Sequence, residues 1–380
     1  MSVVIDGNRI AKIAPRDDFG GAGESIELAG CTLLPGLMDL HSHLFLHPYN
    51  ETPWDDQVLK ESEAYRTVRA VGHARATLAA GFTLLRDLGT EGAGYADVAL
   101  KRAIDEGVTP GPRLVVAGRA IVATGSYGPM RRNFRPDCCV PQGAEEASGV
   151  DEVVRAVRHQ AAHGADWIKL YADYRAGPNG ETVPTFSIDE MRAAVDVAHS
   201  LGRPVASHAT GDEGMRRSVL AGVDTIEHGY GGSPQTFALM QMKGIAYLPT
   251  LMAAKAISLY RGDHVPGGAD SPRMALAAQA FRRAREAGVT IGCGSDVGVF
   301  AHGENLGELA CMAKLGMRNE DALAAATVVN AKILRRENEL GRIAEGFLAD
   351  LIAVEGDPLR DLVALAKPKL VMKDGRVFGG

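Results

Sequence analysis

Short apolar runs alternate with longer amphipathic segments through the middle of the chain. Eight of these runs have the length and composition of buried strands: residues 33–40, 82–87, 113–117, 167–171, 204–208, 223–228, 245–249 and 289–296. The segments between them carry apolar residues at three- and four-residue spacing, which predicts helices, among them 65–80, 151–163, 188–201 and 271–287. Glycines commonly follow these segments, where a helix has to end before the next strand begins.

This order of elements predicts an α/β fold with a parallel sheet. Eight strand-helix units over about 260 residues have the size of a (β/α)8 TIM-like barrel. A doubly wound open sheet is the alternative, but that fold usually carries a Gly-rich phosphate loop after its first strand. His41-Ser42-His43 occupies that place here, which favours the barrel.

The two ends of the chain have a different pattern. Residues 3–10 and 370–377 both predict β-hairpins, with turns at Asp-Gly or Gly-Asn. Together with the apolar run 348–354 they predict a small β-sandwich formed from both termini. We therefore expect two domains, a β-sandwich of residues 1–33 plus 341–380 and a barrel of residues 34–340.

Composition and charge narrow the class of protein. The chain has 380 residues, 46% of them hydrophobic, which suits a well-buried core. A net charge of −6 without any Lys/Arg-rich block argues against nucleic acid as a partner. Five scattered cysteines without Cys-x-x-Cys spacing indicate neither a disulfide framework nor a zinc ribbon, and fit a reducing compartment. No apolar stretch reaches the roughly 18 residues that span a bilayer, so we expect a cytoplasmic protein with no membrane partner.

The ends of the predicted strands carry the candidate chemistry. Side chains in a strand alternate between faces, so His41 and His43 point the same way and can hold one cation. A His-x-His pair also arises by chance, and the later strands decide whether further ligands exist. Four residue types suited to metal binding lie at or near the ends of those strands: Lys169, His208, His228 and Asp296. Because functional groups of a parallel barrel meet at the carboxyl ends of its strands, the six residues predict a metal centre.

Lys169 lies within the apolar run 167–171, where a charged ammonium is costly unless it is paired. Carboxylation removes the conflict, because a lysine with a depressed pKa can add carbon dioxide and become an anionic carbamate that bridges two cations. The alternatives are a lysine that extends to the rim or one that pairs with Asp173.

The other candidates also have structural alternatives. Taken singly, His208 and His228 would more often be structural histidines, but their places at the ends of consecutive predicted strands favour a ligand role. Asp296 is either a helix N-cap or a metal-facing carboxylate that takes a proton from water and passes it to a leaving group.

These motifs resemble those of the amidohydrolase superfamily. The segment 38–43 is similar to its first-strand metal motif, and 166–171 to the fourth-strand segment that holds a carboxylated lysine. Ser207-His208, Ile226-Glu227-His228-Gly229 and Gly294-Ser295-Asp296 resemble its fifth-, sixth- and eighth-strand motifs. The segments 83–87, 226–229 and 302–305 are most similar to the branch of prolidase-like dipeptidases, Xaa-Arg/Lys carboxypeptidases and imidazolonepropionases.

The resemblance implies two divalent metal ions. Their ligand set would be an inner group of His41, His43 and Asp296, an outer pair of His208 and His228, and a bridging carboxylated Lys169. A metal-bridging hydroxide would attack a carbonyl polarised by the outer ion, with Asp296 as the catalytic proton shuttle. Zn2+ is the default ion for a histidine-rich hydrolytic site.

The substrate side departs from the family pattern. Where the peptidase branch commonly has a histidine after the third strand, this chain has Tyr127, which either helps polarise the carbonyl or forms a wall of the pocket. The residues expected to contact the substrate are Tyr171, Arg175, Tyr230 and His302. Arg175 would pair with a carboxylate unless it is merely solvated, and His302 would reach the site unless it caps a helix. The long loop 131–142 is a candidate lid.

The sequence therefore predicts a metal-dependent hydrolase of amide bonds, a dipeptidase or carboxypeptidase on small aminoacyl or N-acyl amino acids, and we expect a homo-oligomer. One alternative is a hydrolase of the same fold that acts on a cyclic amide, a lactone or a xenobiotic amide. Another is a non-catalytic relative that keeps the barrel as a scaffold. Such proteins usually lose ligands, whereas all six candidates are present here.

Overall fold

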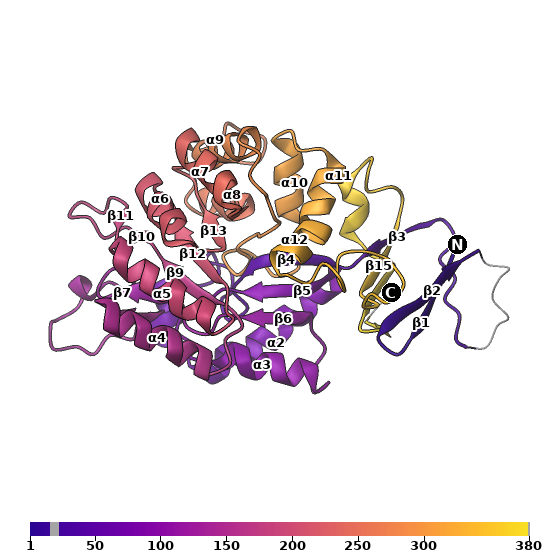
Figure 1. Ribbon diagram of the computed structural model, residues 1–380, viewed down its shortest axis with the longest axis horizontal. Helices are drawn as coiled ribbons and strands as arrows, with labels where there is room; N and C mark the ends of the chain where they lie inside the picture. The colour runs from indigo at the N-terminus through magenta and orange to yellow at the C-terminus, as the bar shows by residue number, and fades with distance from the viewer. Residues whose placement is uncertain (16–22, 379–380) are drawn as a thin grey trace.

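The computed structural model describes residues 1–15 and 23–378, which form two unequal parts (Figure 1). The larger part consists of parallel strands surrounded by helices. The smaller part lies at one end of the elongated molecule and contains short antiparallel strands from both ends of the chain.

The smaller part confirms both predicted hairpins. Its strands are β1 (Ser2–Asp6) paired with β2 (Arg9–Ala14), and a four-stranded sheet in the order β17 (Arg376–Val377), β16 (Leu370–Lys373), β15 (Leu351–Glu355) and β3 (Cys31–Pro35). Apolar side chains of both sheets, such as Ile10, Leu351 and Met372, share one buried cluster. The arrangement as a β-sandwich and the exact domain limits stay predictions.

The larger part contains two parallel sheets. One has the order β14 (Ala246–Leu248), β13 (Thr225–His228), β12 (Val205–Ala209), β9 (Ile168–Tyr171), β7 (Ile121–Ala123) and β8 (Glu145–Ala147); the other consists of β4 (Leu37–Ser42), β5 (Phe82–Asp87) and β6 (Arg113–Val116). Hydrogen bonds connect them: the amides of Asp166 and Trp167 donate to the carbonyl of Val116 after β6. The predicted parallel α/β class is confirmed.

Two predicted strands differ from the structure. The run 33–40 is two strands in different sheets, separated at Gly36, where a Cβ atom would lie 2.1 Å from Oγ1 of Thr83. The run 289–296 forms no continuous strand; it makes single bridges to Tyr247 at Ile291 and to Ser42 at Val297. The run ends at Asp296, where a left-handed φ of 65° stops the extended conformation. The strands β7 and β8 were not predicted, because runs of three residues show no clear period.

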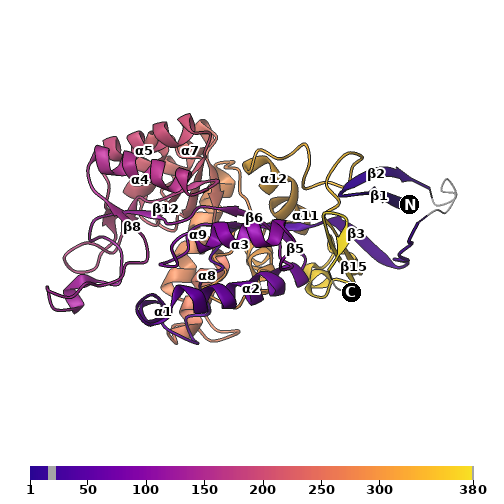
Figure 2. The same cartoon turned by 90° about the horizontal axis from the view of Figure 1, so that it is seen from below.

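Helices cover the parallel sheets, and Figure 2 shows α4, α5 and α7 grouped beside β12. The helices are α1 (Trp54–Lys60), α2 (Glu63–Ala79), α3 (Ala96–Asp105), α4 (Val150–Ala162), α5 (Ile188–Ser200), α6 (Asp212–Ala221), α7 (Pro234–Lys243), α8 (Leu251–Tyr260), α9 (Pro272–Glu286), α10 (Leu306–Lys314), α11 (Asn319–Ala324) and α12 (Asn330–Ile333). The four helices predicted at residues 65–80, 151–163, 188–201 and 271–287 are confirmed to within two residues at each end. Among the described residues, no helix combines the length and the apolar character needed to cross a membrane.

Segments between these elements frame the site. A small hairpin pairs β10 (Asp173–Tyr174) with β11 (Val183–Pro184) directly after β9. The connection between β7 and β8 contains the candidate lid 131–142 and begins it with a short 3-10 turn at Arg131–Asn133. Two of its residues near that turn, Met130 and Arg132, line the main cavity.

Candidate metal centre and active site

The register of the parallel strands aligns the candidate ligands. His208 on β12 lies beside Tyr171 on β9 and beside Glu227 on β13. Two residues earlier, Lys169 is the register partner of Ala206. Because side chains alternate along a strand, Lys169 and Tyr171 share a face, and the same face carries His208. The polar residues at these strand ends therefore gather on one side of the sheet.

His41, His43 and Asp296 come together as a group of three buried ligands. One ligand atom from each lies within 4.8 Å of the others. Oδ1 of Asp296 is 3.5 Å from Nε2 of His41 and 3.3 Å from Nε2 of His43. A backbone hydrogen bond of 2.8 Å from the Asp296 amide to the His41 carbonyl holds the two segments in register. Asp296 is thus placed beside the histidine pair from a distant part of the chain.

Hydrogen bonds at Nδ1 orient three of the histidines. Nδ1 of His41 is 2.7 Å from Glu227, and Nδ1 of His43 is 2.9 Å from the carbonyl of Gly89. Nδ1 of His228 is 2.8 Å from the hydroxyl of Thr250. An imidazole whose Nδ1 donates in this way presents an unprotonated Nε2, which is the form that binds a metal.

His228 extends the group toward His208. The ring centroids of His41 and His228 are 4.9 Å apart, and those of His228 and His208 are 4.5 Å apart. His208 also stacks on Tyr171 at 4.3 Å. The four histidines therefore form a continuous chain of imidazoles across three strands.

Lys169 is fully buried, and among the described residues its Nζ has no hydrogen-bond partner. Both alternatives from the sequence are contradicted. The side chain does not extend to the rim, and Asp173 instead accepts hydrogen bonds from the amides of Thr210 and Gly211. Burial lowers the pKa of Lys169 to about 8, which favours the uncharged amine relative to an ordinary lysine.

The pKa values of His43 and His41 indicate where the site attracts positive charge. Burial opposes protonation of His43, but the hydrogen bond and the charge of Asp296 raise its pKa to about 9. Burial, and then the charge of Lys169, lower the pKa of His41 well below its usual range. The position between His43 and Asp296 thus attracts positive charge, which is either a proton on His43 or a metal ion that displaces this proton. His41 stays neutral.

These residues fit a divalent metal ion. The donor set combines imidazoles anchored through Nδ1, one carboxylate and one buried amine without a partner. Such nitrogen and oxygen donors suit zinc and similar ions. A buried polar atom without a partner is rare in proteins and requires a reason, and a ligand at this point gives one for Lys169.

Two buried carboxylates outside the candidate ligand set, Glu227 and Asp39, fix the positions of the ligands. Glu227 contacts His41, and its other oxygen accepts a hydrogen bond of 2.9 Å from Arg86. Asp39 accepts hydrogen bonds from the amide and hydroxyl of Ser295 and from the side chain of Asn305. The segment that carries Asp296 is therefore fixed to β4.

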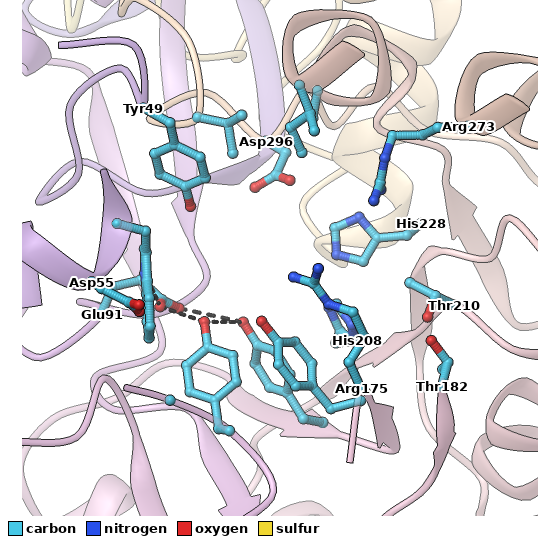
Figure 3. A pocket seen from close by; sticks show the side chains of 18 of the residues that line it. Tyr49, Asp55, Glu91, Arg175, Thr182, His208, Thr210, His228, Arg273 and Asp296 are labelled. Carbon is cyan, nitrogen blue, oxygen red and sulfur yellow. Dashed lines mark hydrogen bonds between the residues drawn. The ribbon is translucent and has the colours of Figure 1, made fainter. Parts of the chain in front are cut away.

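A cavity of about 1070 Å³ opens over the centre and is lined by His43, His208, His228 and Asp296 (Figure 3). Tyr127, Tyr171, Arg175 and Tyr230, four of the residues expected near a substrate, also line it. These four residues and four of the six candidate ligands therefore surround the same space; His41 and Lys169 are not among the residues that line it.

His302 is the exception. It is absent from the residues that line the cavity; its ring stacks on His73 at 4.2 Å, and its Nε2 lies 2.9 Å from the carbonyl of Leu46. It does not cap a helix either, since Asn305 occupies the N-cap position of α10. The expectation of a substrate contact was wrong because the loop after Asp296 packs its histidine against α2.

Sequence reasoning missed Glu91. This buried carboxylate lines the cavity and accepts hydrogen bonds from Tyr127 (2.6 Å), Trp54 (3.0 Å) and Tyr171 (3.3 Å). Its left-handed φ of 52° is uncommon for a residue other than glycine. The signal was its place just after the second predicted strand, 82–87. Because the proton of Tyr127 is directed at Glu91, Tyr127 is here part of the cavity wall.

The fold and the site define a hydrolase class. The chain belongs to the amidohydrolase family, which matches residues 32–378. Among curated relatives, an uncharacterised protein of Mycobacterium tuberculosis is 32% identical over 94% of this chain and 88% of its own length. The ochratoxinase of Aspergillus niger is 31% identical over 92% of this chain and 76% of its own length.

Solved structures agree with this assignment. A Xaa-Pro dipeptidase with bound methionine in its active site superposes with a TM-score of 0.87 at 34% identity, covering 100% of this chain and 94% of that one. The similarity gives this chain a TIM-barrel-like α/β fold. Family and neighbours together identify a hydrolytic enzyme, which argues against the alternative of a non-catalytic scaffold.

Proposed function

We propose that the protein is a metal-dependent amide hydrolase that acts as a dipeptidase or carboxypeptidase on aminoacyl or N-acyl amino acids. The observation that carries the proposal is the buried, unpartnered Nζ of Lys169 beside a set of oriented histidines. A lysine in that place is costly for folding alone. The dipeptidase among the similar structures supports the choice of substrate class.

The proposed centre holds two divalent ions, with Zn2+ as the expected metal. The proposed ligands are His41, His43 and Asp296 for one ion, His208 and His228 for the other, and carboxylated Lys169 between them. When bound, the ions supply Lewis acidity and an activated water. The uncharged amine of Lys169 attacks carbon dioxide, forms a C–N bond and releases one proton, which yields the carbamate.

The side chains around the cavity perform the remaining steps. Asp296 is placed to take a proton and to return it to the nitrogen of the leaving amine. Arg175 faces the same cavity and offers two donors to a substrate carboxylate. Tyr171 and Tyr230 form walls of the cavity. For Tyr230 the reason is that its hydroxyl already donates to Thr250. The segment 131–142 is proposed as a lid over this opening, since Arg132 reaches the cavity.

The proposal includes the closed form of the fold. A complete eight-stranded barrel requires the segment 289–297 to join the two parallel sheets. The backbone amide of Tyr247 donates to the carbonyl of Thr290, and the backbone amide of His43 donates to the carbonyl of Val297, each at 2.9 Å. These bonds link β14 and β4 through one segment and support a (β/α)8 barrel, with a β-sandwich formed by the two ends of the chain.

A second candidate is a hydrolase of a bulkier xenobiotic amide. The identity of 31% to an ochratoxinase and a cavity of about 1070 Å³ favour it, because ligand pockets of about 300–1,000 Å³ already accommodate drug-sized molecules. The metal centre would be the same, and only the walls of the cavity would differ.

Metal analysis combined with a library of dipeptides and N-acyl amino acids tests the proposal. We expect two zinc equivalents and hydrolysis of library members. Lys169→Met should lose metal and activity together. Lys101→Met removes an ammonium that pairs with Asp166 and does not line the cavity, and this variant should retain both. Native mass spectrometry should show one added carbon dioxide in the wild type. Two zinc equivalents without hydrolysis of any dipeptide or N-acyl amino acid in the library would instead support the second candidate.

A further inference from the structure

Four arginines line the cavity without an ion pair. They are Arg132, Arg175, Arg261 and Arg273. Within residues 1–15 and 23–378, no carboxylate lies within salt-bridge distance of any of the four, whereas their neighbours Arg131 and Arg135 pair with Glu146 and Asp137. Cζ of Arg175 lies 5.6 Å from the ring centroid of Tyr174. The protein therefore leaves several cations facing the substrate space.

Arg273 is the most constrained of these arginines. It is half-buried at the second position of α9, where the positive end of the helix disfavours a cation. Burial lowers the pKa of Arg273, and Arg261 and Arg175 lower it further, whereas Tyr230 and Asp263 oppose the shift. Three guanidinium groups thus repel one another at one end of the cavity. Their placement reduces stability, and an anionic ligand would remove that cost.

The opposite side of the cavity is acidic. Asp55 and Glu91 lie across from Arg175 and Arg273, and His228 lies on the side of the two arginines (Figure 3). Glu91 is held by the hydroxyls of two tyrosines and by the indole of Trp54, and Asp55 is exposed without an ion pair among the described residues. An anionic substrate group is therefore repelled from one side and attracted to the other.

We propose that the leaving half of the substrate carries two carboxylates, as in a C-terminal aspartate or glutamate residue, and that Arg175, Arg273 and Arg261 bind them. A single carboxylate accepts one bidentate arginine and leaves the other guanidinium groups unbalanced. A second carboxylate on the side chain balances them. The inference rests on the proposed function, because it names the residue that an amide hydrolase would release.

Paired substrates test the side-chain charge alone. Ala-Glu and Ala-Gln have the same shape, as do Ala-Asp and Ala-Asn. We expect kcat/KM to be about tenfold or more higher for the acidic member of each pair, the effect of one charge-assisted contact. Arg273→Gln should bring the ratio close to one, and Arg273→Lys should retain part of it. The control is Arg282→Gln, an exposed arginine on the same helix that does not line the cavity.

Binding of the released amino acid separates this inference from the proposed function. Isothermal titration of the metal-loaded protein with L-glutamate and L-glutamine requires no hydrolysis. Tighter binding of glutamate that Arg273→Gln abolishes supports the inference, even if no dipeptide is cleaved and the proposed function fails. Equal binding of both amino acids, or cleavage of Ala-Glu and Ala-Gln at equal kcat/KM, overturns the inference and leaves the proposed function intact.

Discussion

Two of the candidate ligands occupy backbone conformations that side chains rarely adopt. Asp296 has φ of 65° and His228 has φ of 70°. Each ends a strand or a strand-like segment, and the left-handed turn directs the side chain over the end of the sheet. Such conformations cost about 1–3 kcal/mol and cluster at functional sites. The proposed ligand role gives a physical reason for both.

Asp296→Asn is expected to abolish turnover and to leave the fold intact. Asparagine adopts the left-handed conformation readily but cannot accept and return a proton. Because general acid-base catalysis contributes about 10²–10⁴-fold, kcat/KM should fall by at least that factor. Steady-state kinetics and circular dichroism measure the two effects. A variant with full activity would contradict the role of Asp296.

Glu227→Gln is expected to weaken metal binding, because Glu227 orients His41 through the 2.7 Å contact at Nδ1. Loss of such an outer partner typically costs about 10–100-fold in metal affinity. Competition with a chelator measures it. Thr225→Val is the control, since Thr225 contacts Glu227 and Arg86 but has no contact with His41. Equal losses of affinity in both variants would show that Glu227 acts only through packing.

At the scale of elements, neighbouring helices supply the groups that hold the loops. Glu308 in the first turn of α10 accepts hydrogen bonds from the amides of Leu251 (3.0 Å) and Met252 (2.7 Å) at the start of α8. Those amides have no partner within their own helix. A single buried carboxyl group therefore connects α10 to α8, and α8 lines the cavity through Ala253 and Ile257.

This contact makes stability depend on pH. Burial raises the pKa of Glu308 to about 8 from 4.5 in the unfolded chain. Below about pH 4.5, Glu308 is protonated in both the folded and the unfolded protein. Between about pH 4.5 and pH 8 the unfolded chain binds fewer protons than the folded protein at this group, so the contribution of Glu308 to the free energy of unfolding is lost as the pH rises. Glu308→Gln should not show this loss of stability with rising pH. The difference in the free energy of unfolding between wild type and Glu308→Gln should therefore shrink between about pH 5 and pH 8. Thermal melts across this range test it, with exposed Glu304→Gln as the control; a constant difference would contradict the assignment.

At the scale of the whole molecule, Arg113 joins the two parts. It lies on β6, and its Nη2 is 2.5 Å from Asp374 and 3.3 Å from Asp350, which both belong to the terminal part. The Asp374 amide also donates to Asp350. The small part is therefore attached to the parallel sheets by charge as well as by apolar contact.

Arg113→Gln should lower the free energy of unfolding by about 3 kcal/mol, because it leaves the buried Asp350 without its cation. Urea denaturation measures the loss. Replacing Arg102, which forms an exposed pair with Glu106, should leave the free energy of unfolding nearly unchanged. Similar losses in both variants would show that the contact does not stabilise the junction of the two parts.

The strand pattern by itself determined the α/β class, the terminal hairpins and the positions at which Lys169, His208 and His228 would be found. Burial of apolar faces imposes a period on the sequence, and in parallel folds the polar residue that ends each apolar run lies at one edge of the sheet. That local regularity is why these features could be predicted from the sequence alone.

Only the tertiary structure decided which residues meet. Gly36 divides one apolar run between two sheets because of the close approach of Thr83, a distant residue. His302 follows a candidate ligand yet packs on His73, while Glu91 and Arg273 reach the cavity without any periodic signal. Their positions depend on how loops fold against the rest of the molecule, and such contacts between distant segments leave no period in the sequence.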